Sequence, residues 1–279
     1  MELIAKPIID KEIEKIKNID CINNVCLVVY QIDNDSASCS YIKSKTKMFN
    51  DVNAKCIVKH FDSNETSAKD IENEIIKDNN NNSINGIIIQ QPVPQEYKYL
   101  TNIVSCDKDV DGFVKNSKFV SCTALGICDL INYYNISTEN KNVVIVGRSN
   151  EVGKPLCNIL SNKQYNANVT LLHSKTSLYN MNYFLREADV VIGCCGVANI
   201  INMSLSKHGT TFINVGMSRI EDKTKKCGYT TFGDIDLTNK YLFNKYNYTP
   251  VFGSTGPLTV LNLLKNTILA YQIQHKSLD

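Results

Sequence analysis

Short apolar runs alternate with longer segments of helical pattern along most of the chain. The first three runs are Val25–Tyr30 (VCLVVY), Cys56–Phe61 and Gly86–Ile89 (GIII). The segments between them, 40–52 and 67–78, have the length and apolar spacing expected of helices. This strand–helix–strand–helix–strand order favours a parallel sheet covered by helices.

A second series of the same kind begins at Asn142–Val146 (NVVIV). Further strands are expected at Val169–Leu172, Val190–Gly193, Thr211–Val215 and Tyr248–Val251, and helices at Ile4–Ile19, Thr123–Tyr134, Pro155–Asn162, Ser177–Ala188 and Pro257–Ile273, the last of them long and amphipathic. A chain of 279 residues is long for one core and sufficient for two α/β domains. We therefore expect an α/β fold with one domain at 1–120 and a second at 121–256.

The composition excludes several classes of function. A net charge of +2 gives no general argument for a nucleic-acid or membrane partner. No apolar stretch approaches the roughly 20 residues of a membrane span, and the N-terminus lacks the features of a signal peptide. The 11 cysteines have no zinc-site spacing, so we expect no metal. They indicate reduced thiols in a cytoplasmic protein, mostly buried, with a catalytic cysteine as the alternative.

Polar residues follow the third apolar run, where a ligand site is expected. Ligands of open α/β sheets bind outside the carboxyl ends of the strands, and Gln90–Pro94 (QQPVP) lies at such an end. The next polar cluster, Asp107–Phe113 (DKDVDGF), has the composition of a loop. Tyr41 and Lys45 are four residues apart on a predicted helix and so share a face. Each of these features also has a simpler interpretation. Tyr41 and Lys45 could be an exposed pair on a helix, Gln90 could cap a strand, and the acids of DKDVDGF could be ordinary loop residues.

A glycine-containing turn follows the strand at Asn142–Val146. In Gly147–Pro155 (GRSNEVGKP), a glycine at the strand end lets backbone N–H groups approach a phosphate, toward which the next helix points its positive end. The turn lacks the middle glycine of the common dinucleotide fingerprint, so simple turn chemistry is the alternative. In a Rossmann-like unit the end of the second strand faces the adenine ribose. That end carries Ser174 and Lys175 rather than an acid. Together with Arg148, these residues suit the phosphate on the ribose of NADP and so favour NADP over NAD. The alternative is that Arg148 and Lys175 simply lie on a solvated surface.

Five separated segments together resemble the methylenetetrahydrofolate dehydrogenase/cyclohydrolase family. They occur in family order and span nearly the whole chain: Ser40–Lys45 (SYIKSK), Gly86–Pro94 (GIIIQQPVP), Lys108–Phe113 (KDVDGF), Val144–Pro155 (VIVGRSNEVGKP) and Thr249–Val260 (TPVFGSTGPLTV). Weaker similarities are Cys122-Thr123, Phe212–Gly216 (FINVG) and Gly233–Asp236 (GDID).

The resemblance implies a fold, an activity and partners. The N-terminal domain would bind folate, the C-terminal helix at 257–279 would return to it, and the domain at 121–256 would be a Rossmann-like NADP-binding domain. A deep cleft would separate the domains, and a homodimer would form through the nucleotide-binding domains. The chain would oxidise methylene-tetrahydrofolate to methenyl-tetrahydrofolate with NADP and hydrolyse that product to formyl-tetrahydrofolate.

The resemblance also implies site residues. Tyr41 would stack on the aminobenzoate of the folate, Lys45 would serve the cyclohydrolase step, Gln90 would bond that lysine, and Asp111 would hold the pterin. Further substrate contacts are expected at Pro92, Gly253, Gly256 and Pro257. Cofactor contacts are expected at Gly147, Arg148, Ser149, Gly153, His173, Ser174, Gly196 and Thr259. A free lysine has a pKa of about 10.4, so Lys45 could act as a base only if burial or a nearby cation lowers it.

Several positions depart from the family pattern. Ala124 and Gln91 stand where the family usually has proline and leucine, and Ser254-Thr255 stand where it has glycine and valine. A serine in place of a glycine with positive φ would strain the loop. A dehydrogenase without cyclohydrolase activity, a non-catalytic folate- or nucleotide-binding protein and an oxidoreductase of the shikimate dehydrogenase kind are therefore the alternative functions.

Overall fold

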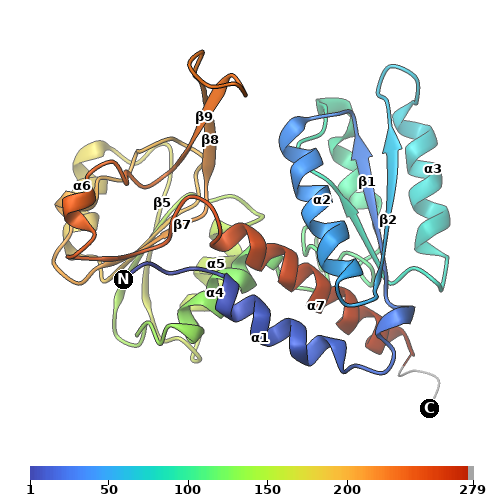
Figure 1. The fold of residues 1–279 in the computed structure, drawn as a ribbon, viewed down its shortest axis with the longest axis horizontal. Helices are drawn as coiled ribbons and strands as arrows, with labels where there is room; N and C mark the ends of the chain where they lie inside the picture. The colour runs from blue at the N-terminus through green and yellow to red at the C-terminus, as the bar shows by residue number, and fades with distance from the viewer. Residues whose placement is uncertain (276–279) are drawn as a thin grey trace. The chain divides into compact units, whose positions relative to one another are not determined.

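The computed structural model describes residues 1–275, which divide into two compact units. The three-stranded unit contains Ile9–Cys122 and the residues from Thr259 onward, and the five-stranded unit contains Met1–Ile8 and Thr123–Leu258. Each unit is built around a parallel sheet, so the expected two-part α/β fold is confirmed (Figure 1).

The sheet of the three-stranded unit has the order β2-β1-β3. Its strands are β1 (Cys26–Ile32), β2 (Lys55–Phe61) and β3 (Gly86–Ile89), connected by α2 (Ser36–Asn50) and α3 (Ala68–Asn79). Both pairings are parallel. The central strand β1 is buried along its whole length, whereas the edge strand β2 is mostly exposed or half-buried. A continuous apolar run such as CLVVY therefore marks a strand that is covered on both faces.

The sheet of the five-stranded unit has the order β10-β7-β6-β4-β5, and all its pairings are parallel. Its strands are β4 (Asn142–Val146), β5 (Asn168–Leu172), β6 (Val190–Gly193), β7 (Thr211–Asn214) and β10 (Asn247–Tyr248), and its helices include α5 (Gly153–Leu160) and α6 (Leu178–Glu187). The apolar core of this unit joins β4 and β6 to α6 through buried side chains such as Val144, Val191 and Leu185.

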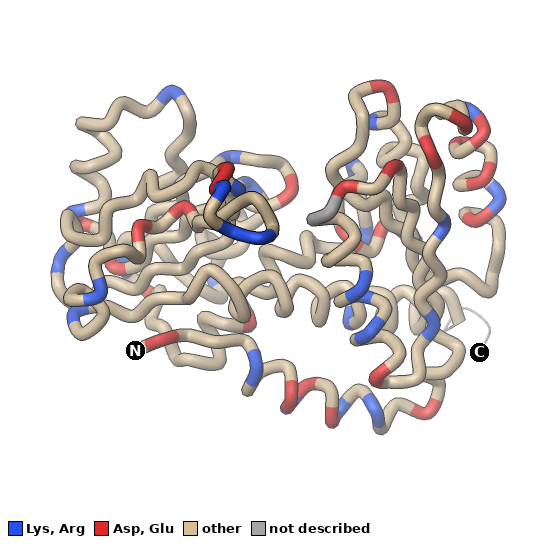
Figure 2. The backbone as a smooth tube through the Cα atoms, turned by 45° about the horizontal axis from the view of Figure 1, so that its top comes forward, with Lys and Arg blue, Asp and Glu red and all other residues tan. Residues whose placement is uncertain are grey.

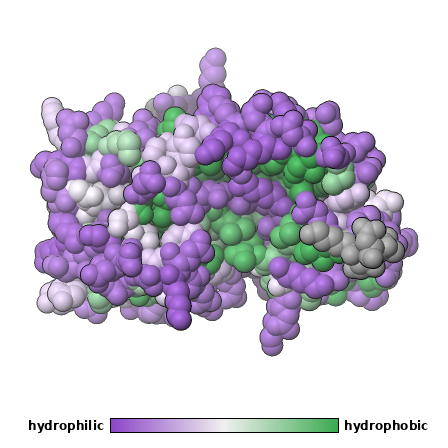
Figure 3. Space-filling model, turned by 90° about the horizontal axis from the view of Figure 1, so that it is seen from below, coloured by the Kyte–Doolittle hydropathy of each residue, from purple (hydrophilic) through white to green (hydrophobic). Residues whose placement is uncertain are grey.

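The remaining elements are short or connect the series. The helices α1 (Lys6–Lys17) and α4 (Cys122–Tyr133) lie close to their predicted ranges. Four 3-10 segments complete the chain: Ile22–Asn24, Gln95–Ile103, Met203–Leu205 and Lys240–Leu242. Acidic and basic residues are interspersed along α1 (Figure 2). Lys15 forms an ion pair with Glu12 at 2.6 Å. The face in Figure 3 is mainly hydrophilic, with scattered apolar patches. Within residues 1–275, no helix has the length and apolar character needed to cross a membrane.

The structure differs from the sequence-based expectation in three elements. An antiparallel hairpin of β8 (Met217–Glu221) and β9 (Tyr229–Gly233) was not predicted, because β8 is mostly exposed, β9 is mostly half-buried and neither forms an apolar run. The strand expected at Tyr248–Val251 is shorter and ends before Pro250, which has no N–H to donate to a neighbouring strand.

The third difference concerns the last helix, α7 (Thr255–His275). It was expected to be amphipathic, but buried side chains lie around most of its circumference: Leu258, Val260, Leu261, Leu263, Leu264, Thr267, Ile268 and Ala270. Most of α7 belongs to the three-stranded unit, where Gln274 hydrogen-bonds Asn85, so the expected return of the C-terminal helix is confirmed. The last four residues of the expected segment 257–279 lie outside the described residues.

Candidate active site

Lys45 and Gln90 meet in the three-stranded unit. Lys45 is 6% exposed, and its Nζ donates a hydrogen bond to Gln90 Oε1 at 2.8 Å. The position of Gln90 is fixed by the sheet, because its backbone N–H donates to the carbonyl of Tyr30 in β1. Its side-chain Nε2 donates to the carbonyl of Gln91 at 2.7 Å, which orients Oε1 toward the lysine. Two residues that are 45 positions apart thus form one polar pair.

Burial weakens the hold of Lys45 on its proton. Desolvation lowers the pKa of Lys45, and the nearby Asp111 carboxylate opposes that shift. Desolvation likewise raises the pKa of Asp111, against the effect of Lys45. The pKa of Lys45 is therefore shifted in the direction that a lysine acting as a proton acceptor requires.

The segment KDVDGF is a loop whose polar residues have separate structural roles. Lys108 is buried, and its Nζ donates to the carbonyls of Asp78 and Asn81 at the end of α3, at 2.9 and 2.7 Å. The Asp109 carboxylate accepts the backbone N–H of Val114 at 2.8 Å and thereby closes the loop. Both side chains are therefore used to hold the loop in place.

Asp111 is the acid of this loop that faces the lysine. It is followed by Gly112, whose φ of +74° and lack of space both require glycine, since a Cβ there would lie 2.7 Å from the backbone N of Ser121. The turn at Gly112 allows the chain to reverse immediately after Asp111. Asp107 is exposed and pairs with Lys118 at 2.8 Å, so it takes no part in this arrangement.

Two further residues hold the backbone beside Asp111, and the sequence-based reasoning did not assign them a role. Asn266 of α7 donates from Nδ2 to the carbonyls of Val110 and Val120, at 2.8 and 3.1 Å. The Cys122 thiol donates to the Val110 carbonyl at 3.1 Å, and burial raises its pKa well above the ordinary value. The sequence offered no distinct signal for Asn266, because α7 contains other polar residues such as Asn262 and Lys265.

Tyr41 and Pro92 lie on the elements that carry Lys45 and Gln90. Tyr41 is half-buried and precedes Lys45 by one turn of α2, and burial raises the pKa of its phenol. Pro92 is exposed and follows a cis peptide bond after Gln91. The Gln91 carbonyl accepts a hydrogen bond from Ser38 Oγ at 3.1 Å, so this turn is tied to α2.

In the five-stranded unit, two glycines form the turn between β4 and α5. Gly147 has a φ of +131°, and a Cβ on it would lie 2.4 Å from the carbonyl oxygen of Cys194. Gly153 is the first residue of α5, and a Cβ on it would lie 1.9 Å from the Gly147 carbonyl oxygen. Neither position has room for a side chain. A turn that brings bare backbone to the start of a helix fits a phosphate group.

The predicted cofactor contacts Arg148, Ser149, His173 and Ser174 occupy the turns after β4 and β5. These strands are neighbours, so both turns lie at the same edge of the sheet. Arg148 and Ser174 are exposed there. Ser149 Oγ accepts the N–H of Val152 at 3.0 Å and His173 Nδ1 accepts that of Lys175 at 3.2 Å.

The segment before α7 accommodates its unusual residues. The positive φ of +78° is at Gly253, and Ser254 is not among the residues with positive φ, so the expected strain at this serine is absent. Ser254 Oγ donates to the Pro250 carbonyl at 2.9 Å, and Thr255 Oγ1 donates to the Asn214 carbonyl at 3.0 Å. The hydroxyl groups of Ser254 and Thr255, the two residues that depart from the family pattern, thus each form a hydrogen bond that stabilises this segment.

The other predicted residues of this region lie within α7. Gly256 and Pro257 are in its first turn, where proline is compatible with a helix because the N–H that it lacks would have no partner within the helix. Thr259 is half-buried and is the first α7 residue of the three-stranded unit. The two other departures from the family pattern differ in burial: Ala124 is fully buried in α4, and Gln91 is exposed.

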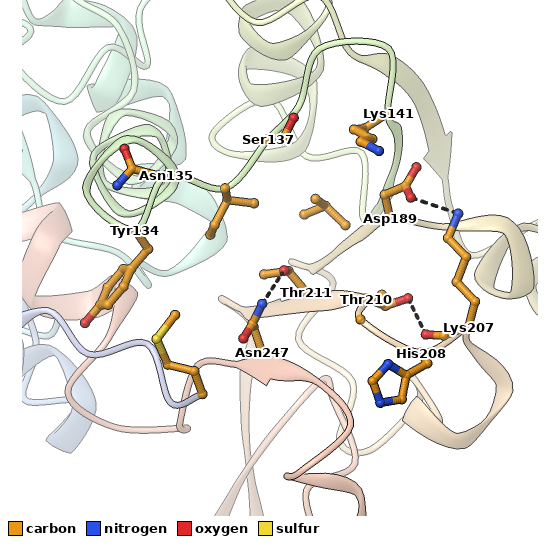
Figure 4. A pocket seen from close by; sticks show the side chains of 14 residues that line it. Tyr134, Asn135, Ser137, Lys141, Asp189, Lys207, His208, Thr210, Thr211 and Asn247 are labelled. Carbon is orange, nitrogen blue, oxygen red and sulfur yellow. Dashed lines mark hydrogen bonds and ion pairs between the residues drawn. The ribbon is translucent and has the colours of Figure 1, made fainter.

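A separate cavity lies at the opposite edge of the five-stranded sheet (Figure 4). Its lining includes residues that precede or begin β4, β6 and β7, among them Lys141, Asp189 and Thr211. Asp189 forms an ion pair with Lys207 at 2.8 Å within it. Because ligands of parallel sheets bind at the carboxyl ends of strands, this cavity is not the candidate active site. In the described part of the chain, His, Cys, Asp and Glu form no group of three that could hold a metal ion.

Comparisons with known proteins cover nearly the whole chain. Residues 2–111 match the model of the tetrahydrofolate dehydrogenase/cyclohydrolase catalytic domain, and residues 121–275 match that of the NAD(P)-binding domain. The bifunctional protein FolD of Chlorobium chlorochromatii is 35% identical over 277 residues, which cover 92% of each chain. FolD of Campylobacter hominis is 38% identical over 87% of this chain and 85% of its own. The solved structure of the bifunctional enzyme FolD from Campylobacter jejuni superposes with a TM-score of 0.87 at 29% identity, covering 98% of this chain and 99% of that one.

Proposed function

Because the chain belongs to the tetrahydrofolate dehydrogenase/cyclohydrolase family, we propose that it catalyses both reactions of a bifunctional enzyme of this class. It oxidises methylene-tetrahydrofolate to methenyl-tetrahydrofolate with NADP, and it hydrolyses the methenyl form to formyl-tetrahydrofolate. The observation that carries this proposal is the buried Lys45, hydrogen-bonded to Gln90 and influenced by Asp111. Lys108 is equally buried, but its Nζ donates to two backbone carbonyls, whereas the Nζ of Lys45 donates to a side-chain amide.

Lys45 serves the hydrolytic step. Addition of water to the methenyl carbon and opening of the ring require protons to move near neutral pH. Desolvation lowers the pKa of Lys45, so its Nζ can accept or release a proton there. The hydrogen bond from Nζ to Gln90 Oε1 holds the amine in place while its remaining positions face the reacting atoms.

Asp111 and Tyr41 bind and orient the folate. The carboxyl group of Asp111 is an acceptor for the ring N–H and amino group of the pterin, and the Gly112 turn fixes its direction. The half-buried ring of Tyr41 offers a face on which the aminobenzoate stacks. Pro92 of the three-stranded unit is assigned a further substrate contact. Gly253, Gly256 and Pro257 of the five-stranded unit keep the substrate contacts that the resemblance implies.

The five-stranded unit supplies the cofactor site. NADP, when bound, accepts the hydride from the folate methylene group. The backbone at Gly147 and Gly153 leaves room for a pyrophosphate beside the start of α5. The exposed Arg148 and Ser174, at one edge of the sheet, bind the phosphate on the adenine ribose and favour NADP over NAD. His173, Ser149 and Gly196 of this unit are assigned to the same ligand. Thr259, a residue of the three-stranded unit, keeps the cofactor contact that the resemblance implies.

The other candidate functions receive less support. A non-catalytic binding protein was suggested by Ser254 and Thr255, yet both hydroxyl groups are accommodated by hydrogen bonds. A dehydrogenase without cyclohydrolase activity would not need the Lys45–Gln90 pair. We also propose a cytoplasmic homodimer. Eleven free cysteines support a reducing compartment, and exposed Tyr179 and Tyr183 on α6 offer apolar surface for a partner.

A turnover assay on the purified protein tests the proposal. Methylene-tetrahydrofolate and NADP are supplied, and NADPH and the methenyl product are followed separately, with spontaneous ring opening subtracted. We expect NADPH to form without lasting accumulation of methenyl-tetrahydrofolate. Persistent accumulation of methenyl-tetrahydrofolate would mean that the protein has dehydrogenase activity but no cyclohydrolase activity. If the folded protein reduces neither NADP nor NAD, the enzymatic function is refuted.

A further inference from the structure

Asp234 is a fully buried carboxylate that binds a backbone turn. It is 0% exposed and directly follows β9. Its two oxygens accept the backbone N–H groups of Cys195 and Val197, at 2.7 and 2.8 Å. These short bonds to an ionised acceptor are of the stronger kind. They fix the turn that follows β6 from a position 39 residues further along the chain.

Two glycines make room for this carboxylate. A Cβ on Gly216 would lie 2.2 Å from Asp234 Oδ2, and a Cβ on Gly193 would lie 2.8 Å from Asp234 Cβ. Gly193 ends β6, and Gly216 follows β7 by two residues. The weakly family-like segments FINVG and GDID thus meet at a single point in the structure, with the glycine of one segment facing the acid of the other.

The turn held by Asp234 packs against the glycine turn of the cofactor site. A Cβ on Gly147 would lie 2.4 Å from the carbonyl oxygen of Cys194, so this carbonyl fills the space beside the glycine. The Cys194 thiol also lies 3.6 Å from the Gly147 carbonyl oxygen, to which it donates. That same carbonyl oxygen is the atom that a Cβ on Gly153 would meet. A continuous series of close backbone contacts therefore runs from the Asp234 carboxylate to the start of α5.

We propose that Asp234 is a positioning residue for the cofactor: its carboxylate fixes the Cys195–Val197 turn, and that turn supports the Gly147 turn on which the NADP pyrophosphate rests. The inference rests on the proposed function only in naming NADP as the ligand. Asp234 does not touch the cofactor. The N–H groups of Cys195 and Val197 point at the carboxylate, and the carbonyl of Cys194, which immediately precedes this turn, lies against Gly147.

Replacement of Asp234 by asparagine tests this role. In Asp234→Asn the amide NH₂ faces a backbone N–H donor, so one of the two hydrogen bonds is lost with almost no change in side-chain volume. Titration calorimetry with NADP should give a Kd raised by about tenfold or more, as expected for the loss of one strong bond. The KM for NADP should rise with it. The cyclohydrolase rate with preformed methenyl-tetrahydrofolate should stay within about twofold, because Lys45, Gln90 and Asp111 belong to the other unit.

Asp236→Asn is the matched control. Asp236 lies two residues away and accepts hydrogen bonds from the backbone N–H and hydroxyl of Thr238 within its own turn. The Asp236→Asn variant loses the same charge as Asp234→Asn but keeps the bonds to the Cys195–Val197 turn. Its Kd for NADP should therefore equal that of the unaltered protein. Equal Kd values for Asp234→Asn and the unaltered protein would overturn the inference, as would equal weakening by both variants.

A measurement on the unaltered protein covers the case in which Asp234→Asn does not fold. The amide protons of Cys195 and Val197 should exchange slowly with solvent in the absence of cofactor, since both are bonded to a buried carboxylate. Rapid exchange at both would overturn the inference while leaving NADP binding intact. Failure of the unaltered protein to bind NADP would instead overturn the proposed function, and the positioning role with it.

Discussion

Replacement of Lys45 by methionine should separate the two reactions. Methionine retains the length and apolar character of the buried lysine stem but can neither move a proton nor donate to Gln90. A positioned acid–base group contributes about 10²- to 10⁴-fold to a rate. We therefore expect Lys45→Met to lower the cyclohydrolase rate by at least about 100-fold, which corresponds to about 2.7 kcal/mol in activation free energy.

Hydride transfer should lose much less in the same variant. It uses no proton of Lys45, and the direction of Asp111 is set by its own loop, through Gly112 and Asp109. We expect the dehydrogenase rate to remain within about tenfold of the original, the residual loss coming from the released Gln90 side chain. NADPH should then form while methenyl-tetrahydrofolate accumulates. Lys43→Met, at an exposed position of the same helix, is the control and should leave both rates unchanged. Equal losses of the two activities in Lys45→Met would refute a step-specific role.

The lowered pKa of Lys45 also predicts a pH dependence with a defined sign. Between this lowered value and the ordinary lysine pKa of 10.5, the unfolded chain binds a proton at this residue and the folded chain does not. The free energy of unfolding therefore rises with pH in that window through this residue. Below the window, a buried charged amine reduces stability. We expect Lys45→Met to be at least as stable as the unaltered protein at neutral pH and to lack this part of the rise, as denaturant titrations at several pH values will show. A large loss of stability at neutral pH would contradict the argument.

Three further changes test the cofactor site and the segment before α7. Arg148→Ala should reduce the preference for NADP over NAD in steady-state assays with both cofactors, and an unchanged ratio would show that Arg148 does not bind the ribose phosphate. Gly153→Ala should abolish NADP binding in calorimetry, because its Cβ would lie 1.9 Å from a backbone oxygen of Gly147; normal affinity would contradict the close packing of this turn. Thr255→Val removes the hydrogen bond to the Asn214 carbonyl and should lower the free energy of unfolding by about 1 kcal/mol. Calorimetry should then show a melting temperature about 2–4 °C lower, and an unchanged melting temperature would show that the bond makes no net contribution to stability.

Most of the secondary structure follows from local patterns. The apolar runs at Gly86–Ile89 and Val190–Gly193 coincide with β3 and β6, because a strand covered on both faces needs an unbroken apolar sequence. The same reasoning missed the hairpin of β8 and β9, because neither the mostly exposed MSRIE nor the mostly half-buried YTTFG is an unbroken apolar run. It also assigned an amphipathic pattern to α7, whose burial depends on how many neighbours surround it rather than on its own sequence.

The candidate site was likewise predicted only in part from the sequence. The sequence singled out Lys45, Gln90 and Asp111 because their segments resemble a known family and follow predicted strands and helices. It could not show that Lys45 is buried or that burial lowers its pKa, since burial depends on parts of the chain as far away as Gln90, 45 positions along the sequence. The resemblance also selected Asp111 rather than Asp109, but only the structure shows that the Asp109 carboxylate closes the loop by accepting the N–H of Val114.

The sequence by itself determined the alternation of strands and helices, the family and the segments that carry the site, because these depend on neighbouring residues and short spacings. Only the tertiary structure decided what Asn266 and Asp234 do. Asn266 bonds a carbonyl 156 positions earlier, and Asp234 bonds a turn 39 positions earlier. A buried polar side chain must find a partner, but which backbone group it finds is set by the packing of helices and strands that are far apart in the chain.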